Sequence, residues 1–181
     1  VFPQGRRAEG DAEGRGEQLT GPLVIAHRGA SGYAFENSPA AFREAVARGV
    51  DGVELDVHAT ADGGIVVHHD PELTGGRPLD TLTLAEATAW LLPNGEPVPT
   101  LAAALTLIGD RDVWIEVKSL PVTYDAALLS ALDRGPFPAR YAVHSFDPRV
   151  TARLSRLRPQ LRLGALLSSR VIDPVAVVRA S

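Results

Sequence analysis

The sequence predicts an α/β fold of the (β/α)8, TIM-barrel type, and three observations support that prediction. Short β-rich runs alternate with helical periods from residue 22 onward, which is typical of parallel βα units. The first β-rich run is not followed by the glycine-rich loop of a dinucleotide-binding sheet. All five histidines lie at or near the predicted carboxyl ends of strands, and in a barrel that edge is the active-site face.

The individual elements follow from apolar runs, helix caps and breakers. Six runs are predicted as strands: Leu23–Ala26, Gly52–Val57, Ile65–His69, Val113–Lys118, Tyr141–Ser145 and Leu161–Leu166. Five helices are predicted between or after them: Ser38 to Gly49, Thr83 to Pro93, Thr100–Ile108, Asp125–Arg134, and one from Asp147 with Val150, Leu154 and Leu157 on one face. A further helix start is predicted at Asp173-Pro174.

Two regions of different composition define the domain organisation. Residues 1–21 are predicted to be a disordered tail or linker, because glycines interrupt a mixed-charge run with few apolar side chains. Residues 22–181 are predicted to form one barrel domain. A (β/α)8 barrel typically needs about 250 residues. We therefore expect the barrel to be truncated after about six βα units, without its last two strands.

Composition excludes several classes of protein and leaves other properties open. The chain has 181 residues, a formal charge of −4 and no cysteine, which excludes disulfide scaffolds, zinc ribbons and thiol chemistry. The absence of a long basic run argues against a nucleic-acid partner, and the longest apolar stretch is too short for a membrane span. A cytoplasmic location is favoured, a secreted mature form is left open, and the oligomeric state is not determined.

The second predicted strand carries the sharpest chemical signal. Side chains alternate between the faces of a strand, so Glu54, Asp56 and His58 share one face and the intervening aliphatic residues share the other. Two neighbouring buried carboxylates repel each other and resist ionisation. A bound divalent ion would offset this repulsion between the carboxylates, and carboxylate oxygens favour Mg2+ or Ca2+ over Zn2+.

The fourth predicted strand repeats this pattern. Glu116 and Lys118 share one face, so Glu116 can complete a three-carboxylate site with a compact ammonium beside it. Lys118 is the only lysine of the chain. A structural Glu–Lys ion pair inside the barrel is the alternative interpretation.

Two other strand ends carry polar groups. The first ends in His27 and Arg28, a proton-transfer group followed by a planar cation that suits phosphate. The third ends in His68, His69 and Asp70, and alternation allows one of these histidines to face the site. Asp70 either orients its partner histidine or caps the turn before Pro71.

Together these motifs resemble the glycerophosphodiester phosphodiesterases. The matching runs, spread over about residues 23–166, are Ala26–Gly29, Glu36-Asn37, Glu54–Asp56, Asp62-Gly63, His69-Asp70 and Ile115–Lys118. The family usually has proline where this chain has Phe35. The resemblance implies a barrel that cleaves glycerophosphodiesters to sn-glycerol 3-phosphate and an alcohol with the help of a divalent metal ion, Mg2+ or Ca2+.

The resemblance also implies roles for individual residues. The implied metal ligands are Glu54, Asp56 and Glu116. The implied acid/base pair is His27 and His69, and the implied phosphate-binding residues are Arg28 and Lys118. Residues implied to lie around the metal or the substrate are Glu36 and Asn37. His58 shares the face of Glu54 and Asp56 on its strand, and both contact with the site and a solvated position at its rim stay open for it.

Several alternatives stay open at this point. A lysophospholipase-D-like enzyme has the same fold, and an inactive, truncated chain that only binds phosphates is a third reading. Which histidine is the base, whether water or a glycerol hydroxyl is the nucleophile, and which alcohol is released are not determined. His68 is expected at the rim of the site, and His144 is left without a role.

Overall fold

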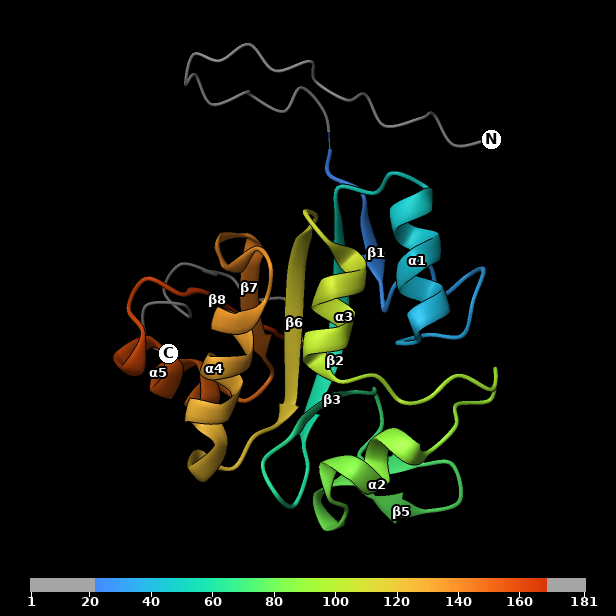
Figure 1. Cartoon of the computed structure of the whole chain (residues 1–181). Helices are drawn as coiled ribbons and strands as arrows, with labels where there is room; N and C mark the ends of the chain where they lie inside the picture. Colours follow the sequence, from blue (N-terminus) through green and yellow to red (C-terminus); the bar gives the residue numbers. More distant parts are fainter. Residues whose placement is uncertain (1–21, 169–181) are drawn as a thin grey trace.

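The computed structural model describes residues 22–168 (Figure 1). Its strands are β1 (Ile25–His27), β2 (Gly52–Ala59), β3 (Ile65–Val67), β4 (Glu72–Leu73), β5 (Arg77–Pro78), β6 (Asp112–Ser119), β7 (Tyr141–Ser145) and β8 (Arg162–Ala165). Its α-helices are α1 (Pro39–Ala47), α2 (Leu84–Ala89), α3 (Leu101–Ile108), α4 (Asp125–Arg134) and α5 (Pro148–Leu157). Short 3-10 turns at 79–81, 122–124 and 138–140 complete the elements.

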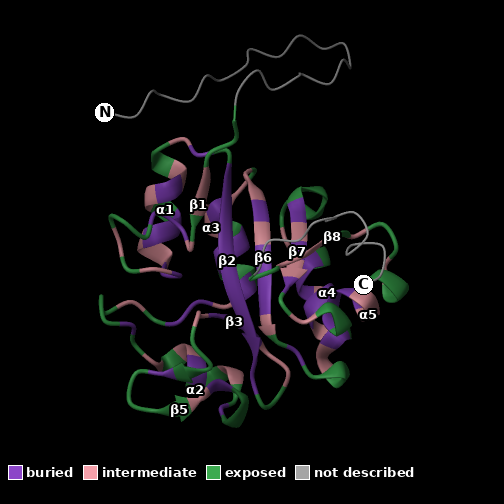
Figure 2. Ribbon diagram, turned by 180° about the vertical axis from the view of Figure 1, so that it is seen from behind, coloured by how far each residue is buried: buried purple, intermediate pink, exposed green. Residues whose placement is uncertain are grey.

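The main sheet is a curved row of parallel strands in the order β1-β2-β6-β7-β8. Figure 1 shows α1, α3, α4 and α5 in front of the strands, and Figure 2, seen from behind, shows the strands in front of the helices. The helices thus cover one face of the sheet. This is the arrangement of successive βα units in a (β/α)8 barrel: each parallel strand lies beside the parallel strand that comes next along the chain.

The core lies between that face of the sheet and the helices. The outward-facing residues of β2 and β6, such as Leu55 and Ile115, are fully buried there against Phe42 of α1 and Leu105 of α3. Caps define the helix ends as the sequence predicts: Ser38 accepts from the Ala41 backbone N–H at the start of α1. The same alternation that buries the aliphatic residues therefore directs their polar neighbours to the opposite face.

One predicted strand has a different role from the one expected. The run predicted as a parallel strand over Ile65–His69 forms β3, which pairs antiparallel with β2. The connection is a tight turn in which the Thr60 N–H donates to the Gly64 carbonyl and Gly63 has φ +83°. A turn of that length can join antiparallel strands only, because a parallel pair needs a crossover. The described part of the chain therefore holds five parallel strands, not six.

Smaller differences concern the ends of elements. The first strand is Ile25–His27 rather than Leu23–Ala26, and the last is Arg162–Ala165 rather than Leu161–Leu166. Leu157, predicted on the buried face of α5, is 59% exposed because it ends the helix. The predicted tail over 1–21 and the helix start at Asp173-Pro174 lie outside the described residues.

Residues 68–100 form an insertion between β3 and α3 that is not part of the repeating βα units. It carries the two-stranded sheet β4-β5 and the helix α2, whose capping box pairs Thr83 with Glu86. Its side chains form a small core of their own around Leu79 and Leu82. In Figure 1 it lies at the end of the sheet toward which β2 and β6 run.

Within residues 22–168, no helix is both long and apolar enough to cross a lipid bilayer.

Candidate functional site

The candidate site lies on the face of the sheet that the helices leave open, level with the interior of β2 and β6 and with the carboxyl ends of β1 and β7. Glu54 and Asp56 of β2 and Glu116 of β6 are 8%, 0% and 7% exposed, so all three carboxyl groups are buried. Asp56 is in register with Glu116, and Glu116 with His144 of β7. Register and alternation together therefore gather acidic and imidazole groups from three strands at one place.

Asp56 is surrounded by an amide and two cationic groups. The Asn37 side-chain amide donates to Oδ2 at 2.8 Å, and Asn37 Oδ1 accepts from the Asp56 backbone N–H at 3.3 Å. The Arg28 Nε lies 3.3 Å from Oδ2, and the Lys118 ammonium lies 3.1 Å from Oδ1. Two cationic groups and an amide therefore surround this fully buried carboxyl.

Glu54 sits in a different electrostatic environment. Burial, and after it the charge of Asp56, raise the pKa of the Glu54 carboxyl from 4.5 to about 7. The Arg28 backbone N–H donates to Glu54 Oε2 at 3.1 Å and opposes that rise. Near neutral pH this group is thus balanced between its two protonation states, and a nearby cation would favour the carboxylate.

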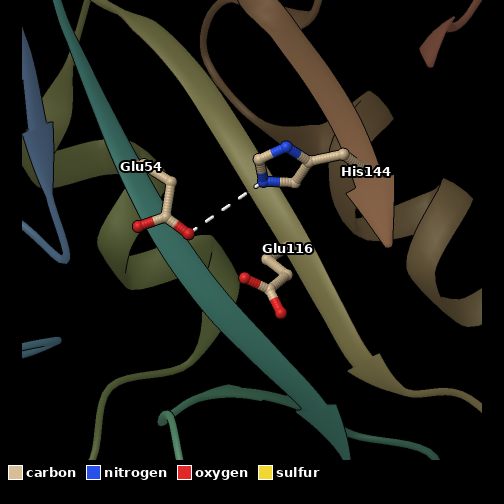
Figure 3. Close-up of side chains that lie close together, drawn as sticks. All are labelled: Glu54, Glu116 and His144. Carbon is tan, nitrogen blue, oxygen red and sulfur yellow. Dashed lines mark ion pairs between the residues drawn. The ribbon is translucent and has the colours of Figure 1, made fainter. Parts of the chain in front are cut away.

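A group that could hold a metal ion is formed by Glu54, Glu116 and His144 (Figure 3). One ligand atom from each lies within 4.8 Å of the other two, and His144 Nε2 is 4.0 Å from Glu54 Oε1. Figure 3 shows the three side chains converging from β2, β6 and β7. Burial lowers the pKa of His144, which favours the neutral imidazole that binds metals.

Lys118 bridges two of the predicted metal ligands. Its ammonium lies 2.5 Å from Glu116 Oε1 and 3.1 Å from Asp56 Oδ1. Burial opposes the charge, but the hydrogen bonds to Glu116 and Asp56 outweigh it and raise the pKa of Lys118. The β2–β6 register shifts after Val57, so that Lys118 is the extra residue of a bulge.

Arg28 and Asn37 carry the two left-handed backbone conformations found at non-glycine residues of the described chain, with φ +56° and +53°. The Asn37 N–H donates to the Arg28 carbonyl at 2.9 Å, so the two positions are joined. The Arg28 guanidinium donates from Nη1 to both oxygens of Glu36, at 3.0 and 2.9 Å. Such conformations cost energy and persist where the surroundings enforce them, as they do here around Asp56.

The loop after β3 holds one of the two predicted acid/base histidines. His69 Nδ1 donates to Asp70 Oδ1 at 2.7 Å, which leaves Nε2 free to accept a proton. This hydrogen bond lowers the pKa of Asp70. From β2, His58 Nε2 donates to the His69 carbonyl at 3.1 Å and fixes the loop. The neighbouring His68 donates from Nδ1 to the Asp70 carbonyl at 2.9 Å.

His27, the other predicted acid/base histidine, ends β1 in register with Glu54. Its Nε2 lies 3.8 Å from Glu54 Oε2, and its side chain is 68% exposed. The group is therefore near the carboxylates and open to a ligand from solvent.

Two hollows flank these residues. One, of about 450 Å³, is lined by residues 35–37 and 68–74 and includes Glu36, Asn37 and His69. The other, of about 580 Å³, is lined by residues 116–118 and 145–149 and includes Glu116 and Lys118. Both hollows are open to solvent, and polar side chains form part of each lining, as in sites that bind small polar ligands.

Sequence reasoning left out one residue that the structure brings to this place. His144 received no role, although Val143 is typical of the core face of a strand and alternation then turns His144 to the other face. Its neighbours Glu116 and Glu54 are set by the order in which the strands pair. That order is not readable from a single strand.

Comparison with known proteins agrees with the motifs. The family model described as "Glycerophosphoryl diester phosphodiesterase family" matches residues 27–179. A glycerophosphodiester phosphodiesterase of Caldanaerobacter subterraneus subsp. tengcongensis is 36% identical over 168 residues, which cover 84% of this chain and 69% of that protein. A Bacillus subtilis relative is 38% identical and covers 76% of this chain and 63% of its own length.

Solved structures share the fold. An Oleispira antarctica phosphodiesterase in complex with the product sn-glycerol-3-phosphate has a TM-score of 0.79 at 26% identity, covering 88% of this chain and 71% of that chain. A glycerophosphodiester phosphodiesterase from Parabacteroides distasonis has a TM-score of 0.75 at 26% identity, covering 86% and 69%. The chain thus spans about two thirds of the length of the relatives it matches. With the family model matched over most of its length, the chain belongs to the glycerophosphoryl diester phosphodiesterase family.

Proposed function

We propose that the protein hydrolyses glycerophosphodiesters to sn-glycerol 3-phosphate and an alcohol, with a divalent metal ion as cofactor. The observation that carries this is the group of buried carboxylates on β2 and β6, Glu54, Asp56 and Glu116, with His27 Nε2 3.8 Å from Glu54. Membership of the family and the product bound to the Oleispira antarctica relative support the substrate class.

The donor set fits a divalent ion. The Glu54 and Glu116 carboxyls face the same space, and the charge of Glu116 contributes to the raised pKa of Glu54. We propose Glu54, Asp56 and Glu116 as ligands, and we propose Mg2+ or Ca2+ because both prefer oxygen ligands. When bound, the ion would offset the negative charge that develops at phosphorus.

The remaining residues bind the phosphate and move protons. Arg28 and Lys118 are proposed to contact the phosphate, with Glu36 and Asn37 holding Arg28 and Asp56 in place. His27 and His69 are proposed as the acid/base pair. The Asp70 carboxylate fixes the His69 ring with Nε2 available, and His58 fixes the loop that carries it.

The test is release of sn-glycerol 3-phosphate from glycerophosphocholine by the 181-residue chain. We expect release with Mg2+ or Ca2+, its loss on addition of a chelator, and its return when the ion is restored. The variant Glu116→Gln keeps the size of the side chain and should lower release at every ion concentration. Release that continues undiminished in chelator would contradict a metal-dependent mechanism.

A further inference from the structure

His144 occupies a place in the site that the proposed ligand set does not use. It lies on β7 in register with Glu116, and its Nε2 is 4.0 Å from Glu54 Oε1. The ligand atoms of these three residues lie within 4.8 Å of one another (Figure 3). Two ligands of one ion, each about 2 Å from it, are at most about 4 Å apart, so small side-chain movements would bring these three atoms to coordination distance of a common ion.

The Nε2 atom of His144 is buried without a hydrogen-bond partner among residues 22–168. His58, the buried histidine of β2, has a partner for its Nε2 in the His69 carbonyl. The side chain of His144 is only 15% exposed, so solvent has little access to it. Buried polar atoms normally have a hydrogen-bond partner. An unpaired buried nitrogen therefore indicates a position that suits a bound ligand.

The groups around His144 Nε2 indicate which kind of ligand would bind there. Among the groups around this nitrogen are the carboxyls of Glu54 and Glu116, each with an oxygen within 4.8 Å of it, and in their ionised form these accept hydrogen bonds and donate none. A neutral imidazole nitrogen and two carboxylates are all electron-pair donors. The species that satisfies three such groups together is a cation with several coordination positions.

We propose that His144 is a nitrogen ligand of the metal ion, alongside Glu54 and Glu116, and that it shifts the metal preference of this chain away from Ca2+ and toward first-row transition ions, for which Mn2+ serves as the probe. Imidazole suits first-row transition metals, whereas Mg2+ and Ca2+ prefer oxygen ligands. Mn2+ accepts both carboxylate and imidazole donors. The inference rests on the proposed function only in requiring that a divalent ion binds between the two glutamates.

The test uses the 181-residue chain with Mn2+ and Ca2+. Calorimetric titration gives the affinity for each ion, and pulsed electron paramagnetic resonance of bound Mn2+ detects a directly coordinated 14N nucleus. We expect 14N coupling in the wild-type protein and its loss in His144→Phe, which keeps a planar ring without nitrogen. Mn2+ affinity should fall by about 10-fold or more, as with other disturbed metal sites, and Ca2+ affinity by a clearly smaller factor.

His27→Phe is the matched control, because His27 Nε2 also lies near Glu54, at 3.8 Å, but is largely exposed. It should keep the nitrogen coupling. The variant His144→Gln retains a polar side chain and should also lose the 14N coupling. Loss in both variants would show that the missing imidazole, and not a packing defect caused by phenylalanine, removes the coupling.

The possible results separate this inference from the proposed function. Binding of Mn2+ without 14N coupling, coupling lost in His27→Phe but kept in His144→Phe, or equal losses of Mn2+ and Ca2+ affinity would each overturn the role of His144. In those cases the carboxylate site would still stand. Failure of the wild-type chain to bind any divalent ion would overturn both proposals.

Discussion

At the scale of single residues, the two proposed acid/base histidines differ in how they are held. His69 is fixed through both its ring, by Asp70, and its carbonyl, by His58, whereas His27 is mostly exposed. Replacing either with alanine should lower turnover of glycerophosphocholine by roughly 10²–10⁴-fold, the usual worth of positioned proton transfer. The affinity for the metal ion, measured by titration, should change little. Turnover at the wild-type level in either variant would rule out its assigned role.

The raised pKa of Glu54 makes a prediction about the metal-free protein. The folded state holds the Glu54 proton more tightly than the unfolded chain, with a pKa of about 7 against 4.5. The associated stability is complete below about pH 4.5 and is lost as the pH rises through 7. At 1.36 kcal/mol per pKa unit, the loss is about 3 kcal/mol.

This prediction is checked by urea unfolding in chelator at pH 5 and pH 8. Glu54→Gln, which cannot ionise, should lack this part of the decline and be more stable than the wild-type protein at pH 8. If the unfolding free energy changed between pH 5 and pH 8 by the same amount in the wild-type protein and in Glu54→Gln, Glu54 would not titrate in this range.

At the scale of elements, one buried ion pair joins two helices of the covered face. Arg153 of α5 donates to both oxygens of Asp125 at the start of α4, at 2.8 and 3.0 Å, and to the Leu120 carbonyl at 3.0 Å. The Asp125 side chain is 5% exposed. Arg153→Ala leaves that charge buried without its partner and should cost about 3 kcal/mol of unfolding free energy.

Arg149 provides the comparison within the same helix. It pairs with Asp147 at 2.8 Å, but its side chain is 84% exposed. Arg149→Ala should leave the unfolding free energy nearly unchanged, because surface ion pairs contribute little. Chemical denaturation of both variants measures the contrast, and equal losses would contradict a difference based on burial.

At the scale of the whole molecule, a bound divalent ion should stabilise the fold. The ligands come from β2, β6 and, by inference, β7, which meet only when the sheet has formed. An ion at 100 times its dissociation constant therefore adds about 2.7 kcal/mol. The rise in melting temperature with Ca2+ or Mn2+ should be larger at pH 8 than at pH 6, because Glu54 must lose its proton to bind. A shift that is independent of pH would argue against Glu54 as a ligand.

The sequence by itself determined the α/β class, most helix and strand positions and which face of each strand carries the acidic groups. These features depend on local patterns: the aliphatic residues of β2 alternate with Glu54 and Asp56, and Ser38 caps α1. Family membership also followed from the spacing of the motifs and is confirmed by the family model. The assigned roles of the site residues stay predictions.

Only the tertiary structure decided how these groups meet. The direction of β3 depended on a tight turn at Gly63, whereas its composition fits either direction of pairing. The partners of His144 depended on the order of β2, β6 and β7, and the position of Lys118 depended on a bulge in their register. Local patterns specify which face a residue occupies, but contacts between strands far apart in sequence arise from pairing, which no single segment encodes.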